Sequence, residues 1–178
     1  NWSNSGTFVD QAGTVTFDGG DAQTVTSGGS DFYNLITTGS STAVTLSDAM
    51  TIANDLTIAS GSSLDVSGSN YAIGIKGNWS NSGTFVDQAG TVTFDGGDAQ
   101  TVTSGGSDFY NLTTATSSTA ITILDNTTIA NNLTIVSGTT LETGSNDVTV
   151  EALLDIAGSS TVNPCLLYTS DAADDAHG

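Results

Sequence analysis

Short stretches in which hydrophobic and polar residues alternate run through most of this chain. In residues 14–17, Val15 and Phe17 alternate with two threonines. A period of two is that of a β-strand, in which successive side chains point to opposite faces. Along the first half of the chain the pattern predicts these inward-facing residues: Val15, Phe17, Val25, Val44, Leu46, Leu56, Ile58, Leu64, Val66, Ile73 and Ile75.

Clusters of Gly, Ser, Asn and Asp separate these stretches, as at residues 19–20, 27–29, 39–41 and 60–62. Such residues adopt the positive-φ and side-chain-to-backbone geometries that tight turns need. Helix signals are almost absent, because β-branched residues and Gly disfavour helices. The chain is therefore predicted to be all-β, with strands of about three to five residues that are too short to be stable alone.

The spacing of the inward residues indicates how these strands are stacked. They recur about every 8–10 positions, so a coil of three strands would take roughly 25 residues. Stacked coils let each short strand pair with the equivalent strand one coil above and below. We therefore predict a parallel β-helix with about three coils in 77 residues. The alternative is a pair of tandem β-sandwich modules, which normally have longer strands.

A long internal repeat supports a stacked architecture. Residues 1–35 recur letter for letter at 78–112, which gives a period of 77 residues, and residues 51–65 align with 128–142 at the same offset. The predicted organisation is a first repeat unit at 1–77 and a second at 78–164. Tandem arrays extend by adding units, so a structural role is expected before a chemical one.

The end of the chain does not fit the repeat. From Cys165 onward nothing matches the unit, and residues 165–175 resemble a translated sequencing adapter. We therefore expect residues 165–178 to be a non-native tail and assign no role to Cys165 or His177. The alternative is a genuine C-terminal tail. Cys is absent from positions 1–164, so no disulfide is expected there.

Charge narrows the range of partners. The 178 residues carry one basic side chain, Lys76, against nineteen acidic ones, for a formal net charge of −18. Nucleic acid is not an expected partner, because phosphate binding needs clustered Lys and Arg. No apolar run approaches the ~20 residues of a membrane-spanning helix, so no membrane insertion is expected. The abundance of Ser, Thr, Asn and Gly favours an extracellular location.

Three stretches carry a family resemblance: residues 77–85, 90–96 and 109–113. They resemble the β-strand repeats of very large secreted bacterial proteins, including filamentous-haemagglutinin-like adhesins, and the resemblance extends over nearly all of residues 1–164. It implies a right-handed β-helix, export to the cell surface, and a stalk or adhesive role in which neighbouring repeats are the main partners. It transfers no catalytic residues.

Two acidic turns are the candidate metal site. Asp18 and Asp21 flank two glycines, and Asp95 and Asp98 flank the copy. Carboxylate oxygens on a tight turn are ligands that Ca²⁺ accepts, so Ca²⁺ is the one cofactor considered. The alternative is a pair of solvated turns in which Asp serves only as a turn former.

The aromatic residues give a second candidate site. Phe32 and Tyr33 are adjacent, as are Phe109 and Tyr110, so one member of each pair must point outward. Tyr33 and Tyr110 are thus candidates for stacking against host or matrix glycans, once per repeat on one side of the molecule. The alternative is that the aromatic residues fill the core.

Two further functions are remote alternatives. Threonine pairs could form an ice-binding array, but they occupy successive strands and are expected on different faces (Thr14/Thr16, Thr24/Thr26, Thr91/Thr93 and Thr101/Thr103). Parallel β-helices also host polysaccharide-active enzymes. This chain has no base to complete a catalytic triad outside the suspect tail, so we expect no enzymatic activity.

Amide side chains are expected to stack at the turns. Asparagines recur there, and such side chains can hydrogen-bond to one another in ladders between coils. The predicted ladder residues are Asn34, Asn54, Asn111, Asn131 and Asn132.

Overall fold

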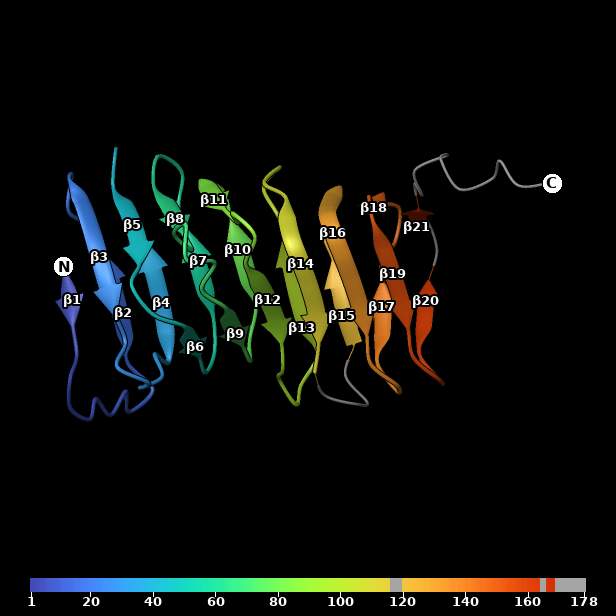
Figure 1. Ribbon diagram of the computed structural model, residues 1–178, viewed down its shortest axis with the longest axis horizontal. Helices are drawn as coiled ribbons and strands as arrows, with labels where there is room; N and C mark the ends of the chain where they lie inside the picture. The colour runs from blue at the N-terminus through green and yellow to red at the C-terminus, as the bar shows by residue number, and fades with distance from the viewer. Residues whose placement is uncertain (116–119, 164–165, 169–178) are drawn as a thin grey trace.

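The computed structural model describes residues 1–115, 120–163 and 166–168, and the latter three only as backbone. Across these residues the chain forms twenty-one strands and no helix, and every strand pairing is parallel (Figure 1). The strands are β1 Trp2–Ser3, β2 Thr14–Phe17, β3 Ala22–Thr26, β4 Asn34–Thr37, β5 Ala43–Leu46, β6 Met50–Ile52, β7 Leu56–Ile58, β8 Ser63–Asp65, β9 Ile73–Ile75, β10 Trp79–Asn81, β11 Thr84–Val86, β12 Thr91–Phe94, β13 Gln100–Thr103, β14 Phe109–Thr114, β15 Ala120–Ile123, β16 Thr127–Ile135, β17 Thr140–Glu142, β18 Val148–Val150, β19 Leu153–Ile156, β20 Thr161–Asn163 and β21 Leu166–Tyr168.

The strands stack into three parallel sheets that run along the long axis of the molecule (Figure 1). The first sheet has the order β1-β3-β5-β8-β11, and the second has the order β2-β4-β7-β10-β13-β15-β17-β20. The third runs β6-β9-β12-β14-β16-β18-β21, with β19 paired to β16. This is a β-solenoid, so the prediction of a parallel β-helix is confirmed and the β-sandwich alternative is wrong.

Two long strands each bend around a corner of the solenoid. In β14, Phe109 pairs with Ile129 and Asn111 pairs with Asn132, with a shift of register between them. In the same way β16 pairs first with β18 and then with β19. In the second half of the molecule, β16 therefore pairs with two different strands, β18 and β19, along its length.

Each turn of the solenoid contains fewer residues than the sequence pattern predicts. Trp79 pairs with Leu56 and with Val102, 23 positions away on either side. Val92 pairs with Ile73, only 19 positions earlier. The mean turn is about 21 residues, so one repeat unit makes about three and two-thirds turns.

Because this is not a whole number of turns, the two copies of the repeat lie on different faces. β1 belongs to the first sheet, whereas its copy β10 belongs to the second. β2 belongs to the second sheet and its copy β12 to the third. Both of these copied strands have moved by one sheet, so their identical residues point in directions about a third of a turn apart.

A narrow apolar core fills the solenoid. All but one of the predicted inward residues are buried, most of them completely. The exception is Val15, which is only partly buried and packs against the core. No turn covers Val15 on its N-terminal side among the described residues, whereas its copy Val92 lies between β9 and β14 and is 2% exposed.

Each copy of the repeat places three aromatic rings together in this core. Trp79, Phe85 and Phe109 lie with ring centroids 4.8 to 5.8 Å apart, Trp79 edge-on to both phenylalanines. Their counterparts Trp2, Phe8 and Phe32 repeat this geometry at 4.9 to 5.9 Å. Edge-on pairs add a favourable quadrupole interaction to the burial of the rings.

The predicted tail lies mostly outside the described residues, Cys165 and His177 included. Residues 166–168 form β21, whose backbone pairs with β18. The boundary between the repeat units, by contrast, lies inside a continuous stack, since β10 at the start of the second unit pairs with β7 of the first.

Candidate functional site

The four candidate calcium ligands form two separate turns. Asp18 and Asp21 lie between β2 and β3, where both are exposed, and Asp95 and Asp98 lie between β12 and β13. The two turns join different pairs of sheets, so the structure does not bring the four carboxylates together. Among the described residues no group of three or more His, Cys, Asp or Glu side chains could hold a metal ion. A Ca²⁺ site at either turn stays a prediction.

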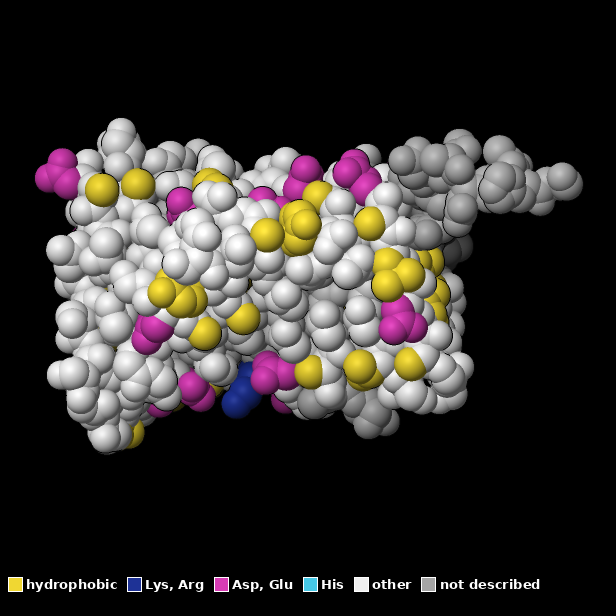
Figure 2. Space-filling model, in the orientation of Figure 1, with side chains coloured by type: hydrophobic (Ala, Val, Ile, Leu, Met, Phe, Trp, Pro, Cys, Tyr) yellow, Lys and Arg dark blue, Asp and Glu magenta, His cyan; other side chains and the backbone are white. Residues whose placement is uncertain are grey.

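Asp95 differs from its copy because a preceding turn lies against it. Its Oδ1 atom is buried without a hydrogen-bond partner. Burial raises the pKa of the Asp95 carboxyl, and the positive charge of Lys76 opposes that rise only in part. Figure 2 shows the one basic side chain, in dark blue, next to acidic side chains. Burial at this turn therefore disfavours the charged form of the Asp95 carboxyl.

A second carboxyl is shifted in the same direction. Burial raises the pKa of Asp87, and the like charge of Asp108 raises it further, while hydrogen bonds from the backbone at Asp87 and Gln88 lower it. Asp87 lies just after β11 and Asp108 just before β14. The pair concentrates negative charge at one corner of the solenoid.

The structure separates the aromatic residues into core and surface. Phe32 and Phe109 are each 1% exposed, whereas Tyr33 and Tyr110 are half-buried, as expected for adjacent residues on a strand. The two tyrosines do not lie on one side, however. Tyr33 precedes β4 of the second sheet and Tyr110 lies in β14 of the third, so the expectation of a single glycan-facing side is wrong. Glycan contact by either tyrosine stays a prediction.

The threonine pairs also divide among the faces. Those on β2 and β13 belong to the second sheet, that on β3 to the first, and that on β12 to the third. The prediction that successive strands carry them to different faces is confirmed. A single flat threonine array of the ice-binding kind is therefore not what these eight residues build.

Hydrogen-bonded side-chain ladders connect successive turns at the corners. Asn54 Nδ2 donates to Asn34 Oδ1 at 2.8 Å, and the copies Asn131 and Asn111 repeat the bond at 2.9 Å. Asn34 in turn donates to Thr14 Oγ1 at 3.2 Å. The predicted stacking of turn asparagines is confirmed for these pairs. Each amide satisfies another amide one turn away, which fixes the register of the stack.

The sequence pattern does not predict a repeated contact in which an aspartate carboxylate binds the backbone of the preceding turn, here called the carboxylate clamp. Asp48 accepts hydrogen bonds from the backbone N–H groups of Ser27 and Gly28 at 2.8 and 2.7 Å, and from the Ser27 hydroxyl at 3.0 Å. Asp125, one repeat period later, holds the backbone of Ser104 and Gly105 at the same two distances. Each aspartate thus binds the turn one coil earlier.

The signal for this clamp was present in the chain. Asp48 and Asp125 are separated by the repeat period, although the residues around them have drifted. An acidic residue preserved at the period within a drifting segment indicates a structural contact. The partner lies about 21 residues away, so spacing alone does not reveal it.

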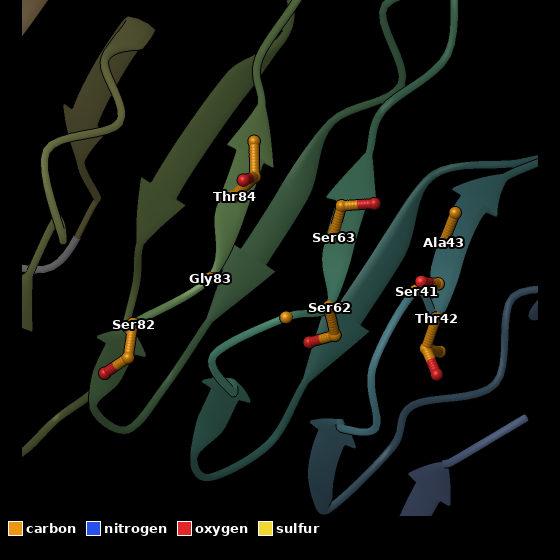
Figure 3. Close-up of a pocket in the computed structure, with 9 residues that line it drawn as sticks. Ser41, Thr42, Ala43, Ser62, Ser63, Ser82, Gly83 and Thr84 are labelled. Carbon is orange, nitrogen blue, oxygen red and sulfur yellow. The ribbon is translucent and has the colours of Figure 1, made fainter. Parts of the chain in front are cut away.

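A shallow groove of about 330 Å³ runs across three successive turns (Figure 3). Ala43, Ser63 and Thr84 occupy equivalent positions on its floor, one per turn. The hydroxyls beside them already have partners: Ser62 donates to the carbonyls of Thr37 and Ala59, and Thr42 donates to that of Gly19. The groove follows from small residues at stacked corners, and its lining residues are all small and uncharged (Ser41, Thr42, Ala43, Gly61, Ser62, Ser63, Ser82, Gly83 and Thr84).

Comparison with protein-family models, with curated proteins and with solved structures finds no match for this chain. In the part of the chain that the structure describes, no helix is long and apolar enough to cross a membrane.

Proposed function

We propose that this segment is a rigid spacer, a stalk-like rod within a larger secreted or cell-surface bacterial protein of the adhesin-like kind. One observation carries the proposal: the second sheet is an uninterrupted parallel ladder of eight strands along a single axis. The repeat continues that ladder without a break, because β10 of the second unit pairs with β7 of the first.

The ladder suits a mechanical role because its hydrogen bonds run along the axis of the rod. Each turn contacts only its neighbours, so length grows with the number of turns while the cross-section stays constant. Strands stack about 4.8 Å apart, so one unit of about three and two-thirds turns adds roughly 18 Å. The corner ladders and the clamps of Asp48 and Asp125 resist slippage between turns.

An adhesive surface is the second candidate, and the partial exposure of Tyr33 and Tyr110 favours it. Aromatic rings at a surface offer flat apolar faces to sugars. The two roles are compatible, since a rod can present side chains along its length. The partners would then be neighbouring repeats for the rod and host or matrix glycans for the tyrosines.

The spacer proposal is tested by adding repeat units. Placing one or two further copies of residues 1–77 before Asn1 preserves the junction seen between Gly77 and Asn78. We expect small-angle X-ray scattering to show that the maximum dimension grows by roughly 18 Å per copy at a constant cross-section. The control adds a Gly and Ser segment of the same length as the unit, which lengthens the chain without a constant cross-section. A particle that widens as units are added would contradict the proposal.

A further inference from the structure

The ladder of the first sheet ends inside the solenoid, at β11. One edge of β11 pairs with β8, and the other edge faces the loop between β13 and β14. Successive residues of a parallel strand direct their backbone N–H groups to opposite edges. At the second edge the Phe85 N–H donates to Ser107 Oγ of the loop at 3.1 Å. A side-chain contact thus replaces the backbone ladder at this place, with turns of the solenoid on both sides.

The first copy of the repeat has the same break in its ladder. There the Phe8 N–H donates to Ser30 Oγ at 3.2 Å. The loop itself is held by an asparagine in each copy: Asn4 Nδ2 donates to the Ser30 hydroxyl at 3.0 Å, and Asn81 Nδ2 donates to that of Ser107 at 3.1 Å. The break is therefore a property of the repeat, because both copies build it from the same contacts.

An open hollow lies at this break. In the first copy its volume is about 390 Å³, and residues 7–10 and 29–31 line it. Phe8 contributes apolar surface, while Asp10 and Asp31 contribute carboxylates from two successive turns. Small-molecule sites are typically concavities of roughly 300–1,000 Å³ that combine apolar surface with a few polar groups. The hollow has the size and the mixed lining of such a site.

The interior copy keeps open space at the equivalent place, although β8 covers β11 on the side of the preceding turn. Phe85 is 5% exposed, whereas the other two rings of its triad, Trp79 and Phe109, are each 1% exposed. A methyl group added at Gly106 would meet no atom within 4 Å, and the same holds for its counterpart Gly29. The hollow therefore does not depend on the position of the copy along the solenoid.

The electrostatics of the hollow favour a positively charged ligand. In the interior copy Asp87 and Asp108 flank it, and the like charge of Asp108 raises the pKa of Asp87 beyond the effect of burial. Lys76 is the one Lys or Arg side chain of the chain, and its charge acts on Asp95 instead. The phenylalanine favours an organic cation over a bare metal ion, because an aromatic ring attracts ammonium groups and covers C–H surface.

We propose that each repeat unit binds one amino sugar in this hollow, with the protonated amine between the two carboxylates and the sugar ring over the phenylalanine. Asp10 and Asp31 form the first site, and Asp87 and Asp108 form the second. Charge-assisted hydrogen bonds from the ammonium group supply the specificity for a free amine. The proposal rests on the adhesive-surface candidate of the proposed function and gives it a ligand class, a glycan that contains deacetylated hexosamine.

Isothermal titration calorimetry of the full chain with a glucosamine disaccharide tests the proposal. At pH 6 the amine is protonated and exposed carboxylates are ionised. We expect two binding sites per chain. The N-acetylated disaccharide has the same ring skeleton without the charge, and we expect it to bind at least tenfold more weakly. A short probe is used because a long cationic polymer would bind any chain of net charge −18 without specificity.

Single carboxylates are then removed from the two sites. Asp108→Asn changes an exposed side chain, so the circular dichroism spectrum is expected to stay that of the wild type while the number of sites falls from two to one. Combining it with Asp31→Asn should weaken binding at least tenfold at both sites. Asp147→Asn is the matched control, because it removes the same charge from an exposed position outside the hollows, and we expect it to bind like the wild type.

Three results would overturn the proposal. One is equal affinity for the two disaccharides, or no heat of binding for either. Another is an equal loss in Asp147→Asn, which would assign the binding to the net charge of the chain. The third is binding that survives loss of the hollow carboxylates and disappears in a Tyr33→Ala, Tyr110→Ala variant, which would move the adhesive surface to the tyrosines. Each of these results leaves the scattering test of the spacer unaffected, since that test measures length without a ligand.

Discussion

Residues 1–35 and 78–112 share one sequence but differ in their surroundings. The aromatic triads have nearly the same geometry in both, so local packing follows the sequence. Burial does not follow it: Trp79 is 1% exposed, whereas Trp2 is only partly buried. The difference comes from the preceding turn, present for one copy and absent among the described residues for the other. In a solenoid, therefore, the energetic weight of a residue is set by the turns on both sides of it.

The sharpest way to test this comparison is to place a charge at one position in both copies. Val92→Asp places a carboxylate in the core between two neighbouring turns, where it lacks a charged or hydrogen-bonding partner. We expect the free energy of unfolding to fall by more than about 3 kcal/mol. Val15→Asp leaves the carboxylate in partial contact with water, so we expect a loss of about 1 kcal/mol.

Urea denaturation monitored by circular dichroism measures both variants. Val15→Asn and Val92→Asn separate the effect of charge from that of polarity. Equal losses for the two aspartate variants would mean that the preceding turn does not govern burial.

The carboxylate clamp should respond equally in the two halves. Asp48 and Asp125 make the same two bonds to backbone N–H groups, and both lie in regions with a turn on either side. We expect Asp48→Ala and Asp125→Ala each to lose about 1–2 kcal/mol, because backbone N–H groups lose a charged acceptor.

The asparagine variant at each position retains one acceptor oxygen and should recover part of the loss. Urea melts of the four variants check this. A loss confined to one aspartate would show that the clamps are not equivalent.

The smallest effect is expected at Asp95, and it depends on pH. Burial raises the pKa of this carboxyl, so folding favours its protonated form. That contribution to stability is complete below the ordinary pKa of 3.8 and is lost as the pH rises through the raised value. Asp95→Asn stays uncharged at every pH. We expect it to melt at a slightly higher temperature than wild type at pH 7 and at the same temperature near pH 3.

Asp18→Asn is the matched control in the first copy, where the side chain is exposed. With a chelator present it should melt like the wild type at both pH values. A gain for Asp95→Asn that persists at pH 3 would assign the effect to something other than charge. If millimolar Ca²⁺ raised the melting temperature of the wild type and not of these variants, the turns would be calcium sites.

Alternation predicted which side chains enter the core, because period two is a property of the strand itself. Phe17 and Leu56 are buried as expected. Turn length was overestimated, because the corners are shorter than the pattern implied: three residues separate β6 from β7. The partial exposure of Val15 was also missed, since it depends on a neighbouring turn and not on the residue. Contacts such as that of Asp48 with Ser27 join positions 21 residues apart, beyond the reach of local periodicity.

The fraction of a turn left over by each repeat gives a long array a screw symmetry. Every unit is rotated by about 120° relative to the one before it, so a given side chain returns to its original azimuth only after three units. Tyr33 and its copy Tyr110 are related by one such rotation. The side chains that each unit exposes are therefore distributed evenly around the axis of such an array. A partner that approaches from any direction meets the same side chain at the same interval along the axis.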